Sequence, residues 1–193
     1  MPHSLRLNIG CGRNILSGWT NVDSAALPGV DVIADLEQCA QAPLPFPDSS
    51  CDEFLLSHVL EHVRNTLGLM QELHRVAKPG AKIVIRTPHG GSDDAWEDPT
   101  HVRAYFPNSF AYFSQLAYWR ADYGYTGDWD LKKLVLFINH SAHEGLSQPE
   151  ILTRLATDRN VVQEMVAELV AIKPRRQPGG EFKPNHETVI TLL

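Results

Sequence analysis

Two glycines follow the first apolar run of the sequence. Residues 5–9 form an apolar-patterned, strand-like run with Leu5, Leu7 and Ile9, and Gly10 and Gly12 follow it. Glycine permits a tight turn with positive φ, and its missing Cβ atom lets a ligand approach the backbone closely. Position 15 is Ile15 instead of the third glycine of the dinucleotide-binding fingerprint. The pattern therefore predicts either a ligand-binding turn or a plain tight turn.

An acidic residue ends the next apparent strand. Asp23 closes the segment 19–23, eleven residues after Gly12, where a carboxylate could accept hydrogen bonds from both hydroxyls of a ribose. Nicotinamide-binding folds usually place this acid about twenty residues after the glycines. Residues 10–19 are too few for a full helical crossover, so the first helix is expected to be vestigial or absent. With little macrodipole to hold a pyrophosphate, the spacing favours a nucleoside ligand that lacks one.

The elements that must position these residues alternate along the first half of the chain. Short β-rich runs are found at residues 5–9, 19–23, 30–34, 53–57 and 82–86. Between the last two runs, apolar residues recur every three or four positions from Leu60 to Ala77, and Pro79 and Gly80 end the pattern. This alternation predicts an α/β fold with a parallel sheet.

The second half of the chain is rich in aromatic residues. Eleven of the 16 aromatic residues lie between Trp96 and Trp129, and they either pack on the sheet or form a lid over a ligand. A helix is expected to start near Pro107. We expect a single domain over residues 1–193. Within it, residues 92–130 form an aromatic-rich acceptor or lid region, and residues 131–139 form a strand. A helical insert at residues 147–172 then precedes a last strand at residues 188–193.

Five segments, taken in order, resemble the successive motifs of class I S-adenosylmethionine-dependent methyltransferases. They are Asn8-Ile-Gly-Cys-Gly12, Gly18-Trp-Thr-Asn-Val-Asp23, Leu44-Pro-Phe-Pro-Asp48, Ser57-His-Val-Leu-Glu-His62 and Arg75-Val-Ala-Lys-Pro-Gly80. The similarity is to small, compact members with a shortened first helix, and it covers about residues 5–115. It implies a Rossmann-like, mostly parallel seven-stranded sheet with an antiparallel edge strand. It also implies S-adenosylmethionine as cofactor, bound along the C-terminal ends of the first four strands.

The resemblance implies eight cofactor-binding residues. Those on the methionine and ribose side are Gly10, Cys11, Gly12 and Asp23; those at the adenine are Asp35 and Leu36; those facing the sulfonium and the acceptor are Ser57 and His58. Two features depart from the family pattern. Asn8 replaces the acid that often begins the first motif, and the truncated first helix removes contacts that larger relatives make.

Methyl transfer to an oxygen or nitrogen also requires that a proton leave the acceptor. The cofactor's sulfonium is already activated, so the enzyme mainly holds the nucleophile in line and close. A polar, turn-rich loop at residues 87–103 follows the fifth strand, at the edge of the sheet where ligands bind. A histidine near its unperturbed pKa suits proton removal at neutral pH. We predict His101 as the base, with His89 and Asp98 as second candidates; alternatively, Asp98 and His101 brace the loop.

His58, Glu61 and His62 also match the inverted zinc-protease pattern His-x-x-Glu-His. Zinc binding would require both imidazoles on one helical face and a further carboxylate ligand. Because residues 52–57 have strand character, His58 is expected at the strand end and His62 on the following helix. The sequence therefore predicts no metal site, and Glu61 and His62 are expected to cap or orient the loop.

Composition and charge exclude several classes of protein. A chain of 193 residues with 43% hydrophobic and 21% charged residues is not disordered, collagenous or a coiled coil. Seventeen basic against 23 acidic residues give a net charge of −6, which disfavours nucleic acid and anionic lipid as partners. The chain shows no membrane-span or signal-peptide pattern, and its three cysteines are odd in number and sit in or beside apolar runs. These features favour a cytoplasmic protein with reduced thiols and no membrane partner.

The sequence thus predicts an S-adenosylmethionine-dependent methyltransferase acting on an oxygen or nitrogen of a small-molecule or sugar-containing acceptor. A noncatalytic scaffold or regulatory subunit of the same fold is the alternative, motivated by Asn8 and by the lack of an unambiguous catalytic constellation. A zinc hydrolase is the third reading. The identity of the acceptor and a homodimeric state are left open.

Overall fold

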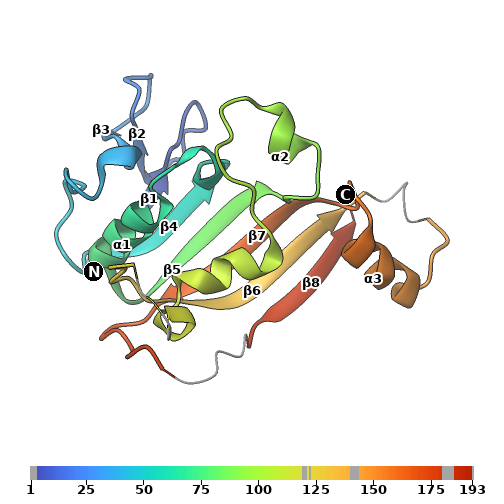
Figure 1. Cartoon of the computed structure of the whole chain (residues 1–193). Coiled ribbons are helices and arrows are strands. Elements are labelled where there is room, and N and C mark those ends of the chain that lie inside the picture. Colours follow the sequence, from blue (N-terminus) through green and yellow to red (C-terminus); the bar gives the residue numbers. More distant parts are fainter. Residues whose placement is uncertain (1–3, 119–120, 122, 140–143, 180–184, 193) are drawn as a thin grey trace.

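The computed structural model describes residues 4–118, 121, 123–139, 144–179 and 185–192 (Figure 1). In this part of the chain one eight-stranded sheet has the order β3-β2-β1-β4-β5-β7-β6-β8. The strands are β1 (Arg6–Ile9), β2 (Thr20–Asp23), β3 (Val32–Ile33), β4 (Cys51–Ser57), β5 (Ala77–Pro88), β6 (Trp129–Ile138), β7 (Val162–Ala171) and β8 (Glu187–Leu192). The α-helices are α1 (Thr66–Val76), α2 (Asp94–Glu97) and α3 (Gln148–Thr157). Short 3-10 helices are η1 (Leu36–Gln38), η2 (Leu60–His62), η3 (Pro107–Phe113) and η4 (Gln115–Tyr118).

The directions of the strands confirm the predicted α/β fold with a mostly parallel sheet. Strand β7 runs antiparallel to both of its neighbours, with Pro88 of β5 opposite Glu164 and Val135 of β6 opposite Val166. The other neighbouring pairs of the described sheet are parallel. Two details differ from the prediction. The described sheet has eight strands because β8 pairs with the outer side of β6, and its antiparallel strand lies inside the sheet instead of at an edge.

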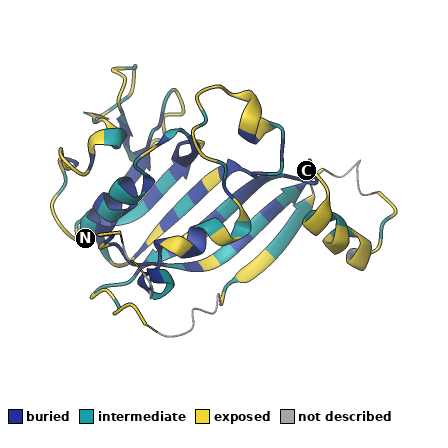
Figure 2. Ribbon diagram, in the orientation of Figure 1, coloured by how far each residue is buried: buried dark blue, intermediate teal, exposed yellow. Residues whose placement is uncertain are grey.

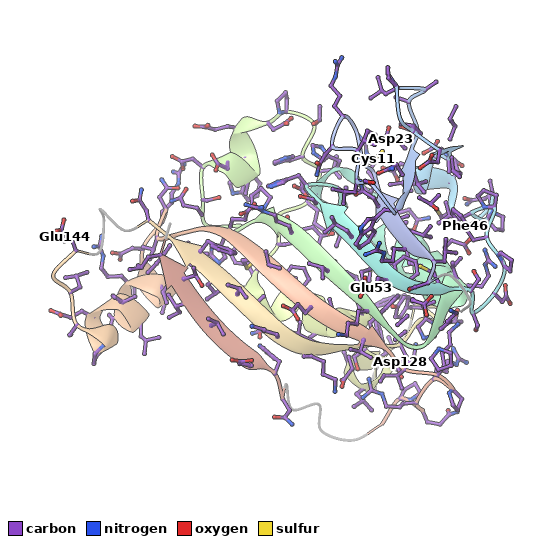
Figure 3. All side chains as sticks on the ribbon, turned by 180° about the vertical axis from the view of Figure 1, so that it is seen from behind. Cys11, Asp23, Phe46, Glu53, Asp128 and Glu144 are labelled. Carbon is purple, nitrogen blue, oxygen red and sulfur yellow. The ribbon has the colours of Figure 1, made fainter. Side chains whose placement is uncertain are left out.

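Helical segments cover one face of the sheet. Helix α1 and the 3-10 helix η3 lie side by side over the middle strands (Figure 1). Seen from behind, the other face of β5, β7 and β6 carries side chains without a described helix across it (Figure 3). The chain between β1 and β2, residues 10–19, forms turns and contains no helix, because so short a connection cannot make a helical crossover. The prediction of a missing first helix is confirmed.

Apolar side chains fill the space between the helical layer and the sheet. Residues of the strands and of α1 that face each other are buried, whereas α2 and α3 are largely exposed (Figure 2). Trp129 is fully buried, packs edge-on against Phe54 at 6.0 Å, and donates from Nε1 to the carbonyl oxygen of Met70 at 2.9 Å. This core links β4, β6 and α1. Its close packing keeps the strands, and the polar residues at their ends, in fixed positions.

The second half of the chain follows the sequence prediction in part. The predicted strands at 131–139 and 188–193 correspond to β6 and β8, and the helix expected near Pro107 is the 3-10 helix η3. The helical insert predicted at 147–172 is wrong after Thr157, where α3 ends and β7 follows. Residues 119–120 and 122 of the predicted lid, and Leu193 of the last strand, lie outside the described residues. Of the described helices, none combines the length and the apolar character that crossing a bilayer requires.

Candidate active site

A cleft of about 280 Å³ lies at the C-terminal ends of β1, β2 and β4. Parallel strands bring their C-terminal ends to one edge of a sheet, where α/β folds bind ligands. Figure 3 shows Cys11 and Asp23 side by side at this edge and Asp128 at the opposite edge. The lining residues are Gly10, Asp23, Ser24, Asp35, Leu36, Glu37, His58, Val59, His62 and Val63.

The turn after β1 requires glycine at its first position. Gly10 has φ of 63°, and a Cβ atom there would lie 2.6 Å from Cγ2 of the buried Val59 side chain. Gly12 has φ of 51°, and its N–H donates to Oδ2 of Asp23 at 2.7 Å. The N–H of Cys11 donates to the carbonyl oxygen of Val22 at 3.0 Å. The turn is therefore held against the end of β2, and its open side faces the cleft.

Two carboxylates lie at this edge, Asp23 as the last residue of β2 and Asp35 two residues after β3. The second oxygen of Asp23 accepts from the N–H of Ala25 at 2.9 Å. Asp35 is the N-cap of η1 and accepts from the N–H of Glu37 at 2.9 Å. Glu37 in turn accepts from the N–H of Arg64 at 2.8 Å, which connects η1 to the chain after η2. These bonds fix both carboxylates in the cleft wall while leaving further lone pairs for a ligand.

Five of the eight predicted cofactor-binding residues line the cleft, namely Gly10, Asp23, Asp35, Leu36 and His58. Cys11, Gly12 and Ser57 lie next to it without lining it. The Cys11 side chain is buried, and burial followed by the Asp23 charge raises the pKa of its thiol. Sequence reasoning missed five further lining residues. His62 was expected only to cap or orient the loop, and the other four carry no distinctive local signal: Ser24, Glu37, Val59 and Val63.

His58 carries a positive charge in the cleft at neutral pH. Its backbone has φ of 55°, and its Nε2 lies 2.8 Å from Oε1 of Glu164 on β7. Its Nδ1 lies 3.3 Å from Oε1 of Glu61. The Glu164 carboxylate, followed by Glu61, raises the pKa of His58 to about 9. Burial alone would raise the pKa of Glu164, but its interactions with His58 and Arg86 lower it to about 2. His58 is thus unsuited to accept a proton.

The structure brings two of the three predicted catalytic residues together. The His101 side chain is 9% exposed, and its ring lies 4.7 Å from the ring of His62, which lines the cleft. Asp98 Oδ2 lies 3.9 Å from His101 Nε2. His89 has other contacts: its Nδ1 accepts from the N–H of Gly91 at 3.1 Å, and burial lowers its pKa. His101 and Asp98 are thus beside the cleft, whereas His89 belongs to the turn that follows β5.

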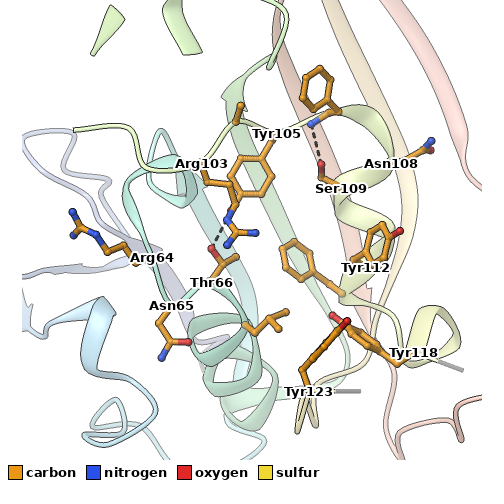
Figure 4. Close-up of a pocket in the computed structure, with 14 residues that line it drawn as sticks. Arg64, Asn65, Thr66, Arg103, Tyr105, Asn108, Ser109, Tyr112, Tyr118 and Tyr123 are labelled. Atoms are coloured by element: carbon orange, nitrogen blue, oxygen red, sulfur yellow. Dashed lines mark hydrogen bonds between the residues drawn. The ribbon is translucent and has the colours of Figure 1, made fainter. Parts of the chain in front are cut away.

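A second pocket of about 480 Å³ lies between α1 and η3 (Figure 4). Arg64 and Asn65 lie on one side of it, and Tyr112 and Tyr118 lie on the other. Its aromatic lining residues are Tyr105, Phe106, Tyr112, Phe113, Tyr118 and Tyr123, and its cationic ones are Arg64 and Arg103. Val63 lines the first cleft and Arg64 lines this pocket, so the two sites adjoin where the chain enters α1.

Residues 7–85 match a protein family model described as a methyltransferase domain. The match begins in β1 and ends in β5, so the methyltransferase domain model contains the glycine turn, both carboxylates and His58. The resemblance inferred from the five motifs is therefore confirmed.

Solved structures of methyltransferases share the fold of this chain. A SAM-dependent methyltransferase from Archaeoglobus fulgidus superposes with a TM-score of 0.62 at 18% identity, covering 88% of this chain and 86% of that chain. A possible histamine N-methyltransferase from Thermotoga maritima gives a TM-score of 0.53 at 14% identity, covering 90% and 84% respectively. These similarities extend beyond the family match into the second half of the chain.

A sequence relative is demethylmenaquinone methyltransferase from Tropheryma whipplei, which is 29% identical over 94 residues. The aligned region covers 41% of this chain and 39% of the relative's length. The chain therefore matches less than half of that protein. The loop after β5 lies outside the family match.

Proposed function

We propose that the protein is an S-adenosylmethionine-dependent methyltransferase acting on an oxygen or nitrogen of a small-molecule acceptor. One observation supports this above the others: the glycine turn, Asp23 and Asp35 line a single cleft at the C-terminal edge of the sheet. When bound, S-adenosylmethionine supplies a methyl group on a positively charged sulfur, which an acceptor atom displaces in line.

The residues of the cleft fit this cofactor. Gly10 lines the cleft, and its φ of 63° together with the approach of Val59 excludes a side chain there. Asp23 would accept hydrogen bonds from the ribose hydroxyls. The buried Leu36 side chain would pack against the adenine, and Asp35 would accept from its amino group. The short turn without a following helix suits a ligand that lacks a pyrophosphate.

The acceptor would lie beyond the His58 and His62 end of the cleft, toward the aromatic pocket. Aromatic rings provide flat surfaces that stack against a planar or sugar ring. Arg64 and Arg103 of this pocket would favour an acceptor that also carries a negative charge. We propose His101 as the residue that receives the acceptor's proton, because its ring contacts His62 of the cleft. Asp98 would hold the loop around His101 in place through its hydrogen bonds to Thr100.

The two other readings have less support. A noncatalytic scaffold would be favoured by a cleft filled with packed side chains, whereas this cleft has an open volume of about 280 Å³. A zinc hydrolase built on His58 and His62 would need both imidazoles on one helical face, but His58 has φ of 55° and pairs with Glu164.

The three cysteines are free and buried, which supports our proposal of a cytoplasmic protein.

Calorimetry with S-adenosylmethionine tests the proposal. We expect saturable binding by the wild type and binding at least about tenfold weaker by Asp23→Ala, because each charged hydrogen bond to a ribose hydroxyl contributes about 1.5–3 kcal/mol. Asp94→Ala, an exposed acid on α2 outside the cleft, is the matched control and should bind as the wild type does. No saturable binding by the wild type, or unchanged binding by Asp23→Ala, would overturn the assignment.

A further inference from the structure

Three side chains converge beside the cofactor cleft without binding one another. One carboxylate oxygen of Glu61 and one imidazole nitrogen each of His62 and His101 all lie within 4.8 Å of one another. Glu61 and His62 belong to η2, and His101 belongs to the loop after α2. The backbone holds the two segments together, since the N–H of Val102 donates to the carbonyl oxygen of Glu61 at 2.8 Å.

Glu61 is a buried carboxylate without hydrogen-bond donors. The residue is 2% exposed, and neither Oε1 nor Oε2 has a hydrogen-bond partner within the described chain. His58 Nδ1 lies 3.3 Å from Oε1 without forming a hydrogen bond, and His58 is also paired with Glu164 at 2.8 Å. A buried charge that lacks donors is unfavourable by several kcal/mol unless a cation compensates it. The His58 imidazolium faces Glu61 Oε1 from one side, but neither oxygen of Glu61 has a hydrogen-bond donor, so both keep lone pairs for a further cation.

Both histidines are held in the tautomer that a metal ligand needs. His101 Nδ1 lies 3.2 Å from the carbonyl oxygen of Ala95, which can only accept, so Nδ1 carries the proton. His62 Nδ1 lies 3.0 Å from Oγ1 of Thr100, whose hydroxyl donates to Asp98 Oδ1 at 2.6 Å and so accepts from His62. In the neutral form of each ring, Nε2 is then the nitrogen with a lone pair for a metal ion, and at His101 this atom lies 3.9 Å from Asp98 Oδ2. Metal-binding histidines commonly donate their other nitrogen to a carbonyl or to a group held by a carboxylate.

We propose that Glu61, His62 and His101 bind a divalent transition-metal ion, with Zn²⁺ as the best-matched species. Two imidazoles and one carboxylate are a ligand set typical of Zn²⁺ sites that keep an open position, whereas Mg²⁺ and Ca²⁺ prefer oxygen ligands throughout. The ligand atoms, now up to 4.8 Å apart, would close around the ion by small side-chain rotations. Asp98 and Thr100 would orient His62.

The position of this site relative to the cleft suggests its role. His62 is both a member of the cluster and a lining residue of the cofactor cleft. An acceptor hydroxyl that occupied the open position of the ion would have its pKa lowered, so it would lose its proton near neutral pH. This role rests on the proposed methyl transfer. With the ion bound, His101 would be a ligand instead of the base, and the acceptor hydroxyl would release its proton to solvent water in the open cleft.

The site differs from the one that the sequence pattern His-x-x-Glu-His indicates. That pattern uses His58, which here pairs with Glu164 instead. The third ligand, His101, comes from a loop that lies far along the chain. The prediction of no metal site followed from the geometry of His58 alone, and the fold supplies a different histidine.

Metal titration of the purified, tag-free protein tests the proposal. After dialysis against a chelator, calorimetry with Zn²⁺ and visible spectra with Co²⁺ should show about one ion bound per chain. Glu61→Gln and His101→Ala should abolish this binding, and Thr100→Val should weaken it by about 10–100-fold. His89→Ala is the matched histidine control and should bind as the wild type does. Absence of stoichiometric binding, or its retention in both ligand variants, would overturn the proposal.

Failure of this inference can be separated from failure of the proposed function. Cofactor binding is measured on the chelator-treated protein, and metal binding is measured without cofactor. Circular dichroism of each variant confirms that it is folded; if Glu61→Gln does not fold, His101→Ala, an alteration in a loop outside the sheet, carries the test. A protein that binds S-adenosylmethionine but no Zn²⁺ would refute only the metal site. A protein that binds Zn²⁺ at this cluster but no S-adenosylmethionine would refute only the methyltransferase assignment.

Discussion

Glu164 on β7 controls the charge of His58 in the cleft, and Glu164→Gln tests this directly. Its carboxylate lies 2.8 Å from His58 Nε2 and also contacts Arg86. The substitution keeps the shape of the side chain but removes its charge. We expect the pKa of His58 to fall from about 9 toward the ordinary value of 6.5, because the carboxylate that most stabilises the imidazolium is gone.

The raised pKa of His58 also contributes to stability. The difference between 6.5 and about 9 corresponds to roughly 3 kcal/mol if it is converted in full. The His58 side chain is 47% exposed, so solvent screening reduces the contribution, and we expect about 1–2 kcal/mol. A raised pKa stabilises the fold fully below the unfolded pKa, and the contribution is lost as the pH rises through the folded pKa. For His58 this window extends from 6.5 to about 9.

Two measurements check this prediction. NMR titration of the imidazole resonances reports the pKa of His58, and urea unfolding across the same pH window reports the free energy of unfolding. As the pH rises across this window, the free energy of unfolding of the wild type should fall by about 1–2 kcal/mol more than that of Glu164→Gln does. Glu168→Gln, an exposed acid on the same strand, is the control and should behave as the wild type. A pKa of His58 that stays near 9 in the Glu164→Gln protein would refute the reasoning.

Three further substitutions test other parts of the structure. Gly10→Ala places a Cβ atom 2.6 Å from Val59 Cγ2 at φ of 63°, so S-adenosylmethionine binding by calorimetry should weaken, and unchanged binding would contradict a role for the turn. Arg176→Met removes the guanidinium that pairs with the fully buried Asp128, and urea unfolding should show a loss of about 3–5 kcal/mol; a loss below about 1 kcal/mol would mean that other donors suffice. Trp129→Ala empties a fully buried site and should also lower the free energy of unfolding by about 3–5 kcal/mol, seen in scanning calorimetry as roughly 2–4 °C per kcal/mol; an unshifted midpoint would be inconsistent with this core.

Short-range patterns predicted the first half of the chain well. Apolar runs that end in glycine or an acid became β1 and β2 with their polar ends at one edge of the sheet. The missing first helix followed from the length of residues 10–19. These features depend on the conformational freedom of Gly10 and on strand propensity, and both are properties of a few neighbouring residues.

Strand β7 shows where such patterns fail. Residues Val162–Ala171 contain Gln, Met, Leu, two glutamates and two alanines, all compatible with a helix, alongside three valines. The segment lies between β5 and β6 and is hydrogen-bonded on both sides. Backbone hydrogen bonds to strands on both sides outweigh the weak local preference for a helix. The residues of the segment itself do not reveal that β5 and β6 will lie beside it.

The amino-acid sequence alone was sufficient to locate the glycine turn, the carboxylates Asp23 and Asp35 and the family to which they point. The fold was needed to place Glu164 against His58, through the antiparallel register that sets Pro88 opposite Glu164. It was also needed to bring His101 to Glu61. Backbone turns and strand ends depend on adjacent residues, whereas contacts between side chains from distant segments depend on strand register and loop path, which emerge only when the whole chain packs.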